Sequence, residues 1–272
     1  MHPVLLRLGS LPINTYGLML AISFVLGLYL AARRSSAIGV SRNDIYDLGM
    51  RIMIAAIVGS RLFYVLTHMS EFQDNWLDVV AIWKGLYGLS MLGGVLLAVA
   101  VGFYTVWRKK LPVWRLSDAV IPSFALGIFL TRIGCFLNGC CFGFETSCPL
   151  GVTFPDSAMA YSGTGIAAGA HVHPTQLYSS AAGLFILLVL LWADRRKHFP
   201  GFIFVLFSGL YGVTRFGLEE FRYFDHDPSM MLGFSYIAQR PGITDNQFIS
   251  LLMLAGSLIL GTWLYLRYRR TC

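Results

Sequence analysis

Apolar residues gather along this chain in seven segments, and polar and basic residues occupy the connections between them. Segments of about 17–25 residues are long enough to cross the ~30 Å hydrocarbon core of a bilayer as helices. The expected helices cover residues 15–32, 45–66, 86–107, 118–138, 176–194, 201–220 and 247–266. The first is too long and too lightly flanked by positive charge for a cleaved signal peptide, so we expect it to be retained.

The composition agrees with this pattern, since 56% of the residues are hydrophobic and 13% are charged. Such values are typical of polytopic membrane proteins and exclude an ordinary soluble domain. We therefore expect an all-α fold in a single integral-membrane domain, residues 1–272. The connection at 139–175 is long for a structureless loop, and we expect it to form a small periplasmic head.

Basic residues fall mainly on one side of the expected helices, and the positive-inside rule places that side in the cytoplasm. Thirteen basic residues lie on one side: Arg33, Arg34, Arg42, Arg108, Lys109, Lys110, Arg115, Arg195, Arg196, Lys197, Arg267, Arg269 and Arg270. Four lie on the other: Arg7, Lys84, Arg222 and Arg240. The N-terminus is thus expected outside and the C-terminus in the cytoplasm. The net charge of +7 follows from topology and does not point to nucleic acid.

Three arginines interrupt apolar segments: Arg61, Arg132 and Arg215. At 1.5 Å per residue each lies about 21–24 Å from the expected cytoplasmic face, so all three share one level in the outer half of the bilayer. A buried guanidinium is costly and usually marks a functional cavity, and its rigid fork of donors suits phosphate. These arginines therefore predict a pocket for an anionic lipid head group; snorkelling to the outer interface is the alternative.

Other polar side chains are expected at the same level. Tyr16 begins the first helix and Tyr211 lies one helical turn before Arg215. Glu219 and Glu220 follow one turn later and could pair with Arg215 or Arg222. His173, Gln176 and Tyr178 open the fifth helix.

Six motifs, in order along the chain, resemble those of bacterial prolipoprotein diacylglyceryl transferases. They are YGLM at 16–19, SRLFYV at 60–65, TRIGCFLNGCCFG at 131–143, HPTQLY at 173–178, YGVTRFGLEEFR at 211–222 and GITDNQFIS at 242–250. No single motif is decisive, but their order together with the seven expected spans makes the resemblance specific.

The resemblance implies transfer of diacylglyceryl from phosphatidylglycerol to the signal-peptide cysteine of prolipoproteins, with release of glycerol phosphate, in the bacterial inner membrane. It implies no metal and no cofactor. The catalytic residues that it implies are Tyr16, Arg132, His173, Tyr211 and Arg215. The residues that it implies for phosphatidylglycerol binding are Arg61, Gly93, Gly94, Arg132, Asn138, Gly143, Gln176 and Arg215.

The chain departs from the family pattern at three positions. Leu92 stands where the family has the histidine of an H-G-G segment, and leucine cannot accept a proton. Cys135 replaces an asparagine and Cys140 a glutamate of the signature. Either another group (Tyr16, His173 or Glu220) activates the acceptor thiol, or the chain is a paralogue with an altered acceptor.

Four cysteines crowd into fourteen residues: Cys135, Cys140, Cys141 and Cys148. A disulfide between Cys148 and Cys140 or Cys141 is the leading interpretation, because an exterior location permits it. Inert packing, a redox role and a thiolate near Arg132 that itself receives lipid are the alternatives. The spacing of Cys140, Cys141 and Cys148 is weak evidence for a metal site.

Two other classes of function compete with lipid transfer. A lipid or solute transporter could use the arginine cavity as its binding site, but the sequence shows neither an inverted repeat nor paired broken helices. A membrane thiol oxidoreductase would normally carry a C-x-x-C pair, which the adjacent Cys140 and Cys141 do not supply.

Overall fold

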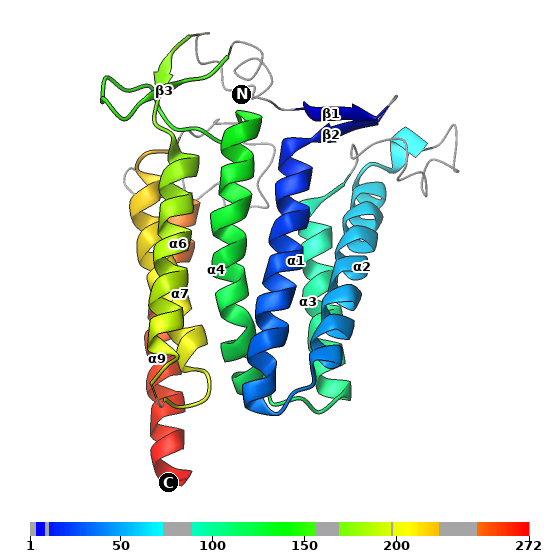
Figure 1. Ribbon diagram of the computed structural model, residues 1–272, viewed down its shortest axis with the longest axis vertical. Coiled ribbons are helices and arrows are strands. Elements are labelled where there is room, and N and C mark those ends of the chain that lie inside the picture. Colours follow the sequence, from blue (N-terminus) through cyan, green and yellow to red (C-terminus); the bar gives the residue numbers. More distant parts are fainter. Residues whose placement is uncertain are drawn as a thin grey trace. The chain divides into compact units, whose positions relative to one another are not determined.

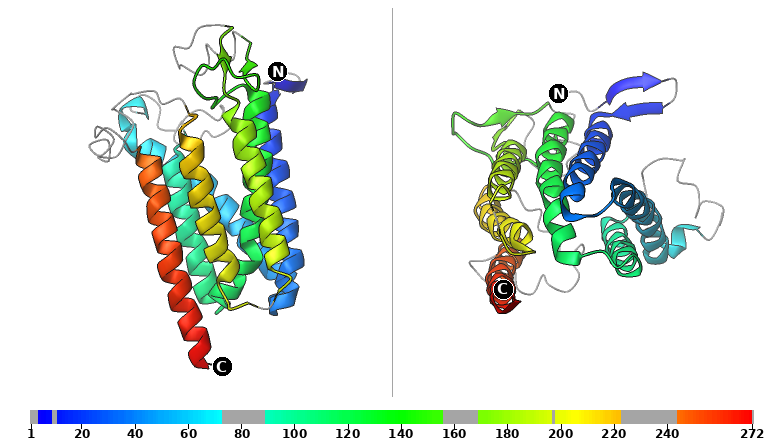
Figure 2. Two further views of the ribbon diagram at one scale, coloured as in Figure 1. Left: turned by 90° about the vertical axis from the view of Figure 1, so that its left-hand side faces the viewer. Right: turned by 60° about the horizontal axis from the view of Figure 1, so that its bottom comes forward.

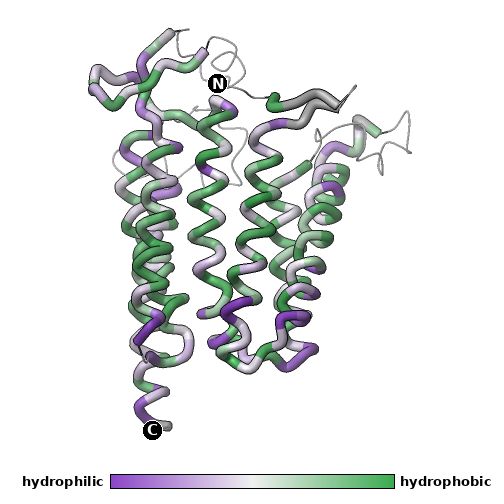
Figure 3. The backbone as a smooth tube through the Cα atoms, in the orientation of Figure 1, coloured by the Kyte–Doolittle hydropathy of each residue, from purple (hydrophilic) through white to green (hydrophobic). Residues whose placement is uncertain are grey.

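The computed structural model describes residues 4–8, 11–72, 89–155, 169–196, 198–222 and 244–271. Within these ranges seven helices are long and apolar enough to cross a membrane, which confirms the expected architecture. Their middles are hydrophobic and their ends carry hydrophilic residues (Figure 3). Lys84, Lys197, Arg240 and Cys272, which entered the sequence argument, lie outside the described residues.

The helices begin and end close to their expected bounds (Figure 1). They are α1 Thr15–Ser35, α2 Arg42–Thr67, α3 Met91–Arg108, α4 Val113–Asn138, α6 Thr175–Ala193, α7 Phe202–Glu219 and α9 Asp245–Thr271. Helix α4 begins five residues earlier than expected, because the amide of Leu116 already donates to the carbonyl of Pro112 at 2.8 Å. Proline is well tolerated at a helix start, where its missing N–H costs nothing.

The chain divides into two compact units. One contains Met1–Ala31 together with Ser117–Cys272, and the other contains Ala32–Leu116. The smaller unit holds α2, α3 and two short 3₁₀ turns, η1 (Ser36–Ile38) and η2 (Met69–Phe72). The larger unit holds the other five long helices and two small hairpins.

Glycines bring α2 and α3 into close contact in the smaller unit. A Cβ atom on Gly59 would lie 2.5 Å from the carbonyl oxygen of Gly93, and one on Gly94 would lie 3.0 Å from that of Ala56. The amide of Ser90, just before α3, donates to the carbonyl of Ser60 at 2.9 Å. Small residues of this kind let membrane helices approach closely.

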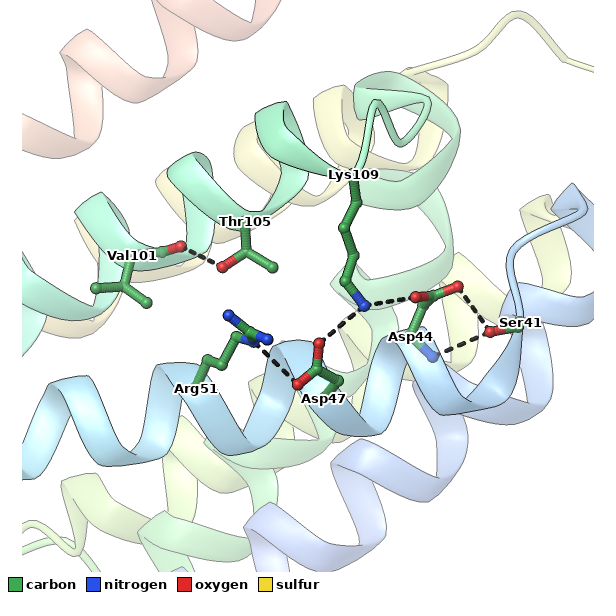
Figure 4. A network of polar contacts seen from close by, with 7 residues as sticks. All are labelled: Ser41, Asp44, Asp47, Arg51, Val101, Thr105 and Lys109. Atoms are coloured by element: carbon green, nitrogen blue, oxygen red, sulfur yellow. Dashed lines mark hydrogen bonds and ion pairs between the residues drawn. The ribbon is translucent and has the colours of Figure 1, made fainter.

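A polar network joins the other ends of α2 and α3 (Figure 4). The Nζ of Lys109 lies 2.6 Å from Asp44 and 2.8 Å from Asp47, and Arg51 bonds Asp47 at 2.9 Å. The hydroxyl of Ser41 caps α2 by accepting the amide of Asp44 at 3.1 Å. Hydrogen bonds to the two carboxylates raise the pKa of Lys109, so this lysine is held in its charged form.

In the larger unit α7 packs against α6 on one side and α9 on the other (Figure 2). The core between α4, α6 and α7 contains Ala125, Ile186, Leu190 and Ile203, all at most 1% exposed. Asp118 of α4 accepts the amides of Gly201 and Phe204, at 2.6 and 3.1 Å, and thereby satisfies the start of α7.

Two hairpins lie at the end of this unit where α1 begins and α4 ends (Figure 1). The first pairs β1 (Val4–Leu8) with β2 (Leu11–Asn14), and the second pairs β3 (Val152–Thr153) with β4 (His171–Val172). Behind the second hairpin a small core forms from Phe142, Phe154 and Val172. The connection after α4 thus contains packed structure in its described part, as its length predicted.

Candidate functional site

Three of the predicted site residues line one pocket in the larger unit. Arg132 reaches it from α4, Tyr211 and Arg215 reach it from α7, and Gly183 of α6 belongs to its wall. Gly183 is required there, because a Cβ atom would lie 2.9 Å from the backbone nitrogen of Phe129. Two arginines and a tyrosine therefore line one small pocket, together with the hydroxyl residues Ser179 and Thr214. Their positive charges suit a single anionic group.

An acidic residue holds Arg215 in place. The Nη2 atom of Arg215 lies 2.9 Å from the Oε2 atom of Glu219. The side chain of Glu219 is fully buried, and that of Arg215 is 15% exposed. The pairing that the sequence suggested between Arg215 and Glu219 is confirmed. The hydroxyl of Thr244 donates to the other oxygen of Glu219 at 3.5 Å, and Gln247 donates to Glu220. These bonds tie the end of α7 to the start of α9.

Further charged and polar groups surround the two pocket arginines. Arg222 and Arg132 both act electrostatically on Arg215, so three cations lie within range of one another. Arg132 also attracts Tyr16, whose side chain is 38% exposed at the start of α1. Backbone atoms of Tyr16 lie beside Gly134, two residues after Arg132. Such a group of cations attracts an anion and is costly without one.

Gly143 and His173 do not line this pocket; they contact one another in the head. The amide of Gly143 donates to the carbonyl of His173 at 2.9 Å, and a Cβ atom on Gly143 would meet Thr175 at 2.7 Å and also the carbonyl of Phe221. The His173 ring contacts Phe221, with centroids 5.2 Å apart, and its Nδ1 lies 3.3 Å from the hydroxyl of Tyr178. Gly143 therefore allows its backbone to pass close to that of Phe221, and His173 has the hydroxyl of Tyr178 as a polar partner.

The start of α6 fixes the two adjacent cysteines. The Nε2 of Gln176 donates to the carbonyl of Cys140 at 2.7 Å, and the hydroxyl of Thr175 donates to that of Cys141 at 2.9 Å. Gln176 is completely buried, and Asn138, at the end of α4, hydrogen-bonds the side chain of Cys140. Both Gln176 and Asn138 thus position this loop, while their predicted contact with lipid stays a prediction.

The cysteines are arranged differently from the leading interpretation. All four described cysteines are free thiols, so the disulfide expected for Cys148 is not formed. Instead the sulfurs of Cys135, Cys140 and Cys141 lie within 4.8 Å of one another. Hydrogen bonds from Cys135 and Cys140, together with the positive charge of Arg132, lower the pKa of Cys141. The chain turns after the end of α4 and brings Cys140 and Cys141 next to Cys135 in the last turn of that helix. Cys148 does not belong to this group.

The remaining predicted residues belong to the smaller unit. The guanidinium of Arg61 lies over the rings of Phe72 and Tyr64, 5.3 and 6.0 Å from their centroids. Gly93 and Gly94 are buried in the contact between α2 and α3, so they have a packing role. The binding role predicted for these three residues stays a prediction.

Sequence reasoning left several contributors out of the predicted site. Glu219 and Arg222 were considered as possible partners in an ion pair but were not named as site residues, although Glu219 pairs with Arg215 and Arg222 adds to its field. Thr175 lies in the HPTQLY motif but was not singled out. The cluster of Cys135, Cys140 and Cys141 could have been anticipated from its spacing, since residues five and six apart meet when a helix ends between them.

Known protein families and sequences resemble this chain over most of its length. A family model described as prolipoprotein diacylglyceryl transferase matches residues 3–263. A phosphatidylglycerol–prolipoprotein diacylglyceryl transferase of Clostridium tetani is 34% identical over 223 residues, which cover 82% of this chain and 86% of the relative. One of Synechococcus elongatus is 31% identical over 271 residues, covering 97% and 87%. A third, of Thermus thermophilus, is 34% identical over 230 residues, covering 79% and 82%.

Proposed function

We propose that this chain, which belongs to the prolipoprotein diacylglyceryl transferase family, transfers the diacylglyceryl group of phosphatidylglycerol to the cysteine thiol of prolipoproteins. The observation that carries the proposal is the pocket in which Arg132, Tyr211 and Arg215 converge. Relatives that are named for this reaction support the choice of substrates.

The chemistry of the reaction explains why arginines are needed. The acceptor thiol gives up its proton, which passes to solvent or to the released glycerol phosphate. Its sulfur forms a bond to the terminal carbon of the diacylglyceryl group, and the bond between that carbon and the phosphate oxygen breaks. Glycerol phosphate leaves with the electron pair, so negative charge grows on its oxygens. Arg132 and Arg215 stabilise that charge most when they are already fixed in place. The ion pair of Arg215 with Glu219 supplies such fixing.

Tyr16 and Tyr211 complete the proposed site. Tyr211 lines the pocket one turn from Arg215, and Tyr16 lies within the electrostatic range of Arg132. A phenol hydroxyl can donate a hydrogen bond to a phosphate oxygen. His173 is assigned to the neighbouring head, where it faces Tyr178. We infer that it orients the incoming acceptor peptide and the surrounding loop.

The membrane arrangement follows from charge. With thirteen basic residues on one side and four on the other, we infer that the N-terminus and the head are periplasmic and the C-terminus is cytoplasmic. The membrane is then the bacterial cytoplasmic (inner) membrane. The partners are phosphatidylglycerol, the surrounding lipid and the signal peptides of prolipoproteins, whose acceptor cysteine reaches the membrane from the outer side.

A transfer assay tests the proposal. The purified full-length protein is mixed with phosphatidylglycerol vesicles and a peptide that carries a lipoprotein signal-peptide cysteine. We expect the peptide to gain the mass of one diacylglyceryl group and glycerol phosphate to be released in equal amount.

Two controls make the assay specific. A peptide with serine in place of the acceptor cysteine gains no mass, and vesicles of phosphatidylethanolamine alone give no product. Intact folded protein that forms no thioether with the cysteine peptide, at any phosphatidylglycerol concentration, contradicts the proposed function.

A further inference from the structure

The sulfurs of three cysteines converge at the end of α4. Those of Cys135, Cys140 and Cys141 all lie within 4.8 Å of one another. Cys135 is buried within the last turn of the helix, Cys140 is half-buried and Cys141 is exposed. The group therefore has a closed inner side and an open outer side, through which a small ion can enter.

The backbone that carries the three sulfurs is fixed by hydrogen bonds. The amide of Cys140 donates to the carbonyl of Cys135 at 3.2 Å. From the start of α6, Gln176 holds the carbonyl of Cys140 and Thr175 holds that of Cys141, at 2.7 and 2.9 Å. Supporting bonds of this kind orient the ligands of metal sites. The three thiols are thus brought together by two helices and do not meet by chance in a free loop.

Two further observations set this loop apart. Cys141 has a φ of +65°, a left-handed conformation that is uncommon for a residue other than glycine. Backbone of this type is strained and gathers at functional sites. In addition, the Oε1 atom of the fully buried Gln176 has no hydrogen-bond partner among the described residues.

We propose that Cys135, Cys140 and Cys141 form a binding site for a thiophilic metal ion of the Zn²⁺ or Cu⁺ class, for which sulfur is the preferred ligand. Soft thiolate ligands select such ions over Mg²⁺ or Ca²⁺, which require oxygen. Binding replaces the thiol protons, which pass to solvent, and consumes no oxidant or reductant.

The spacing of the sulfurs suits this class of ion. In a tetrahedral zinc site with Zn–S bonds of about 2.3 Å the sulfurs are about 3.8 Å apart. The three sulfurs here, within 4.8 Å, need to approach by at most about 1 Å. Three thiolates and one Zn²⁺ carry a net charge of −1, and Arg132 and Arg222 both lie within electrostatic range of Cys141 to balance it.

The metal site does not depend on the proposed transfer reaction. Lipid transfer as proposed uses the arginine pocket and needs no metal, whereas the metal site uses only the cysteine group. Binding is therefore measured directly and not through activity, so either proposal can fail while the other stands.

A titration with Cd²⁺ tests the site. The full-length protein is purified in detergent, reduced, freed of metal and titrated while the ultraviolet charge-transfer band of cadmium thiolate is recorded. We expect one equivalent per chain, with competition by Zn²⁺. Cys140→Ser and Cys141→Ser should weaken Cd²⁺ binding at least tenfold. Cys148→Ser is the matched control, because Cys148 is a free thiol outside the cluster, and should bind as the parent does.

A second measurement uses the unaltered chain, in case a variant does not fold. Zn²⁺ should slow alkylation of Cys140 and Cys141 by iodoacetamide at least tenfold, as measured by peptide mass, and leave Cys148 unaffected. The proposal is overturned if no thiolate band forms or if Cys148→Ser loses as much Cd²⁺ affinity as Cys141→Ser. It is also overturned if Zn²⁺ protects neither Cys140 nor Cys141 from alkylation.

Discussion

Buried charges decide the chemistry of the pocket at the scale of single residues. Arg215 lies 2.9 Å from a fully buried carboxylate, so its own charge is partly balanced before any ligand arrives. Arg132 has no acidic neighbour in the pocket lining that the structure describes. Together the two leave an excess of positive charge, which a phosphate group can neutralise.

Loss of either pocket arginine should abolish most of the transfer. Arg132→Ala and Arg215→Ala each remove about 2–4 kcal/mol of transition-state stabilisation, or on the order of 10²–10³ in rate. Arg215→Lys should also be poor, because a point charge does not replace a planar fork of donors. The transfer assay measures these rates. Arg196→Ala removes an exposed arginine from the turn after α6 and serves as the control. Near-normal turnover in either pocket variant would exclude a shared phosphate pocket.

A histidine at position 92 should preserve or raise activity. Leu92 stands where the family pattern has the histidine of its H-G-G segment, which is a candidate base. Leu92 is 38% exposed at the start of α3. An imidazole at this partly exposed position is not fully buried, so the free-energy cost of burying a polar ring is limited. Turnover of Leu92→His is compared with that of the parent and of Leu92→Gln. If the histidine variant folds but is slower than both, the base lies elsewhere.

Close helix packing dominates at the scale of elements. In the smaller unit α2 and α3 meet through Gly59, Gly93 and Gly94, and Lys109 joins their other ends. In the larger unit Asp118 reaches from α4 to the start of α7. In the smaller unit close backbone contact at one end and ion pairs at the other hold the two helices together, and in the larger unit a carboxylate holds the start of α7.

A methyl group at the contact between α2 and α3 should destabilise the smaller unit. In Gly59→Ala the new Cβ meets the carbonyl of Gly93 at 2.5 Å and the side chain of Leu97 at 2.6 Å. Overpacking of this kind costs about 1–3 kcal/mol. Thermal unfolding in detergent measures the loss. Gly256→Ala is the control, because no atom lies within 4 Å of a Cβ built there; equal melting temperatures for the two variants would contradict the packing argument.

Charge distribution governs the molecule as a whole. The basic residues in or just after the last turns of α1, α3, α6 and α9 are expected on one side of the membrane. The hairpins and the cysteine group lie where α1 begins and α4 ends. The proposed acceptor enters from this second side. Orientation in the membrane is therefore part of the function.

Reporter fusions test the orientation. A fluorescent protein that folds only in the cytoplasm, joined after residue 272, should be bright, whereas alkaline phosphatase at the same place should be inactive. Alkaline phosphatase joined after residue 155, in the head, should be active. Reversed signals at the two positions would refute the inferred topology and place the arginine pocket at the inner leaflet.

The apolar segments of the sequence determined much of this architecture by themselves. The length and spacing of the apolar segments set the number of spanning helices, because the bilayer fixes how many residues cross it. The cost of a guanidinium in hydrocarbon singled out three arginines. Arg132 and Arg215 line one pocket, whereas Arg61 belongs to the smaller unit, and their role in binding stays a prediction. Spacing of one helical turn made an ion pair of Arg215 with Glu219 one of the possible pairings, and the structure contains it.

Tertiary structure alone decided what depends on residues distant in sequence. Helix packing, not local pattern, brought Tyr211 of α7 and Arg132 of α4 to one pocket and used Gly93 and Gly94 for a helix contact. The end of α4 and the start of α6 together turned the chain so that Cys135, and not Cys148, meets Cys140 and Cys141. The first two of these arrangements rest on contacts between residues far apart in sequence, which no local period encodes. The cysteine cluster joins residues only five and six apart, but the loop that closes it is held by Gln176 from α6.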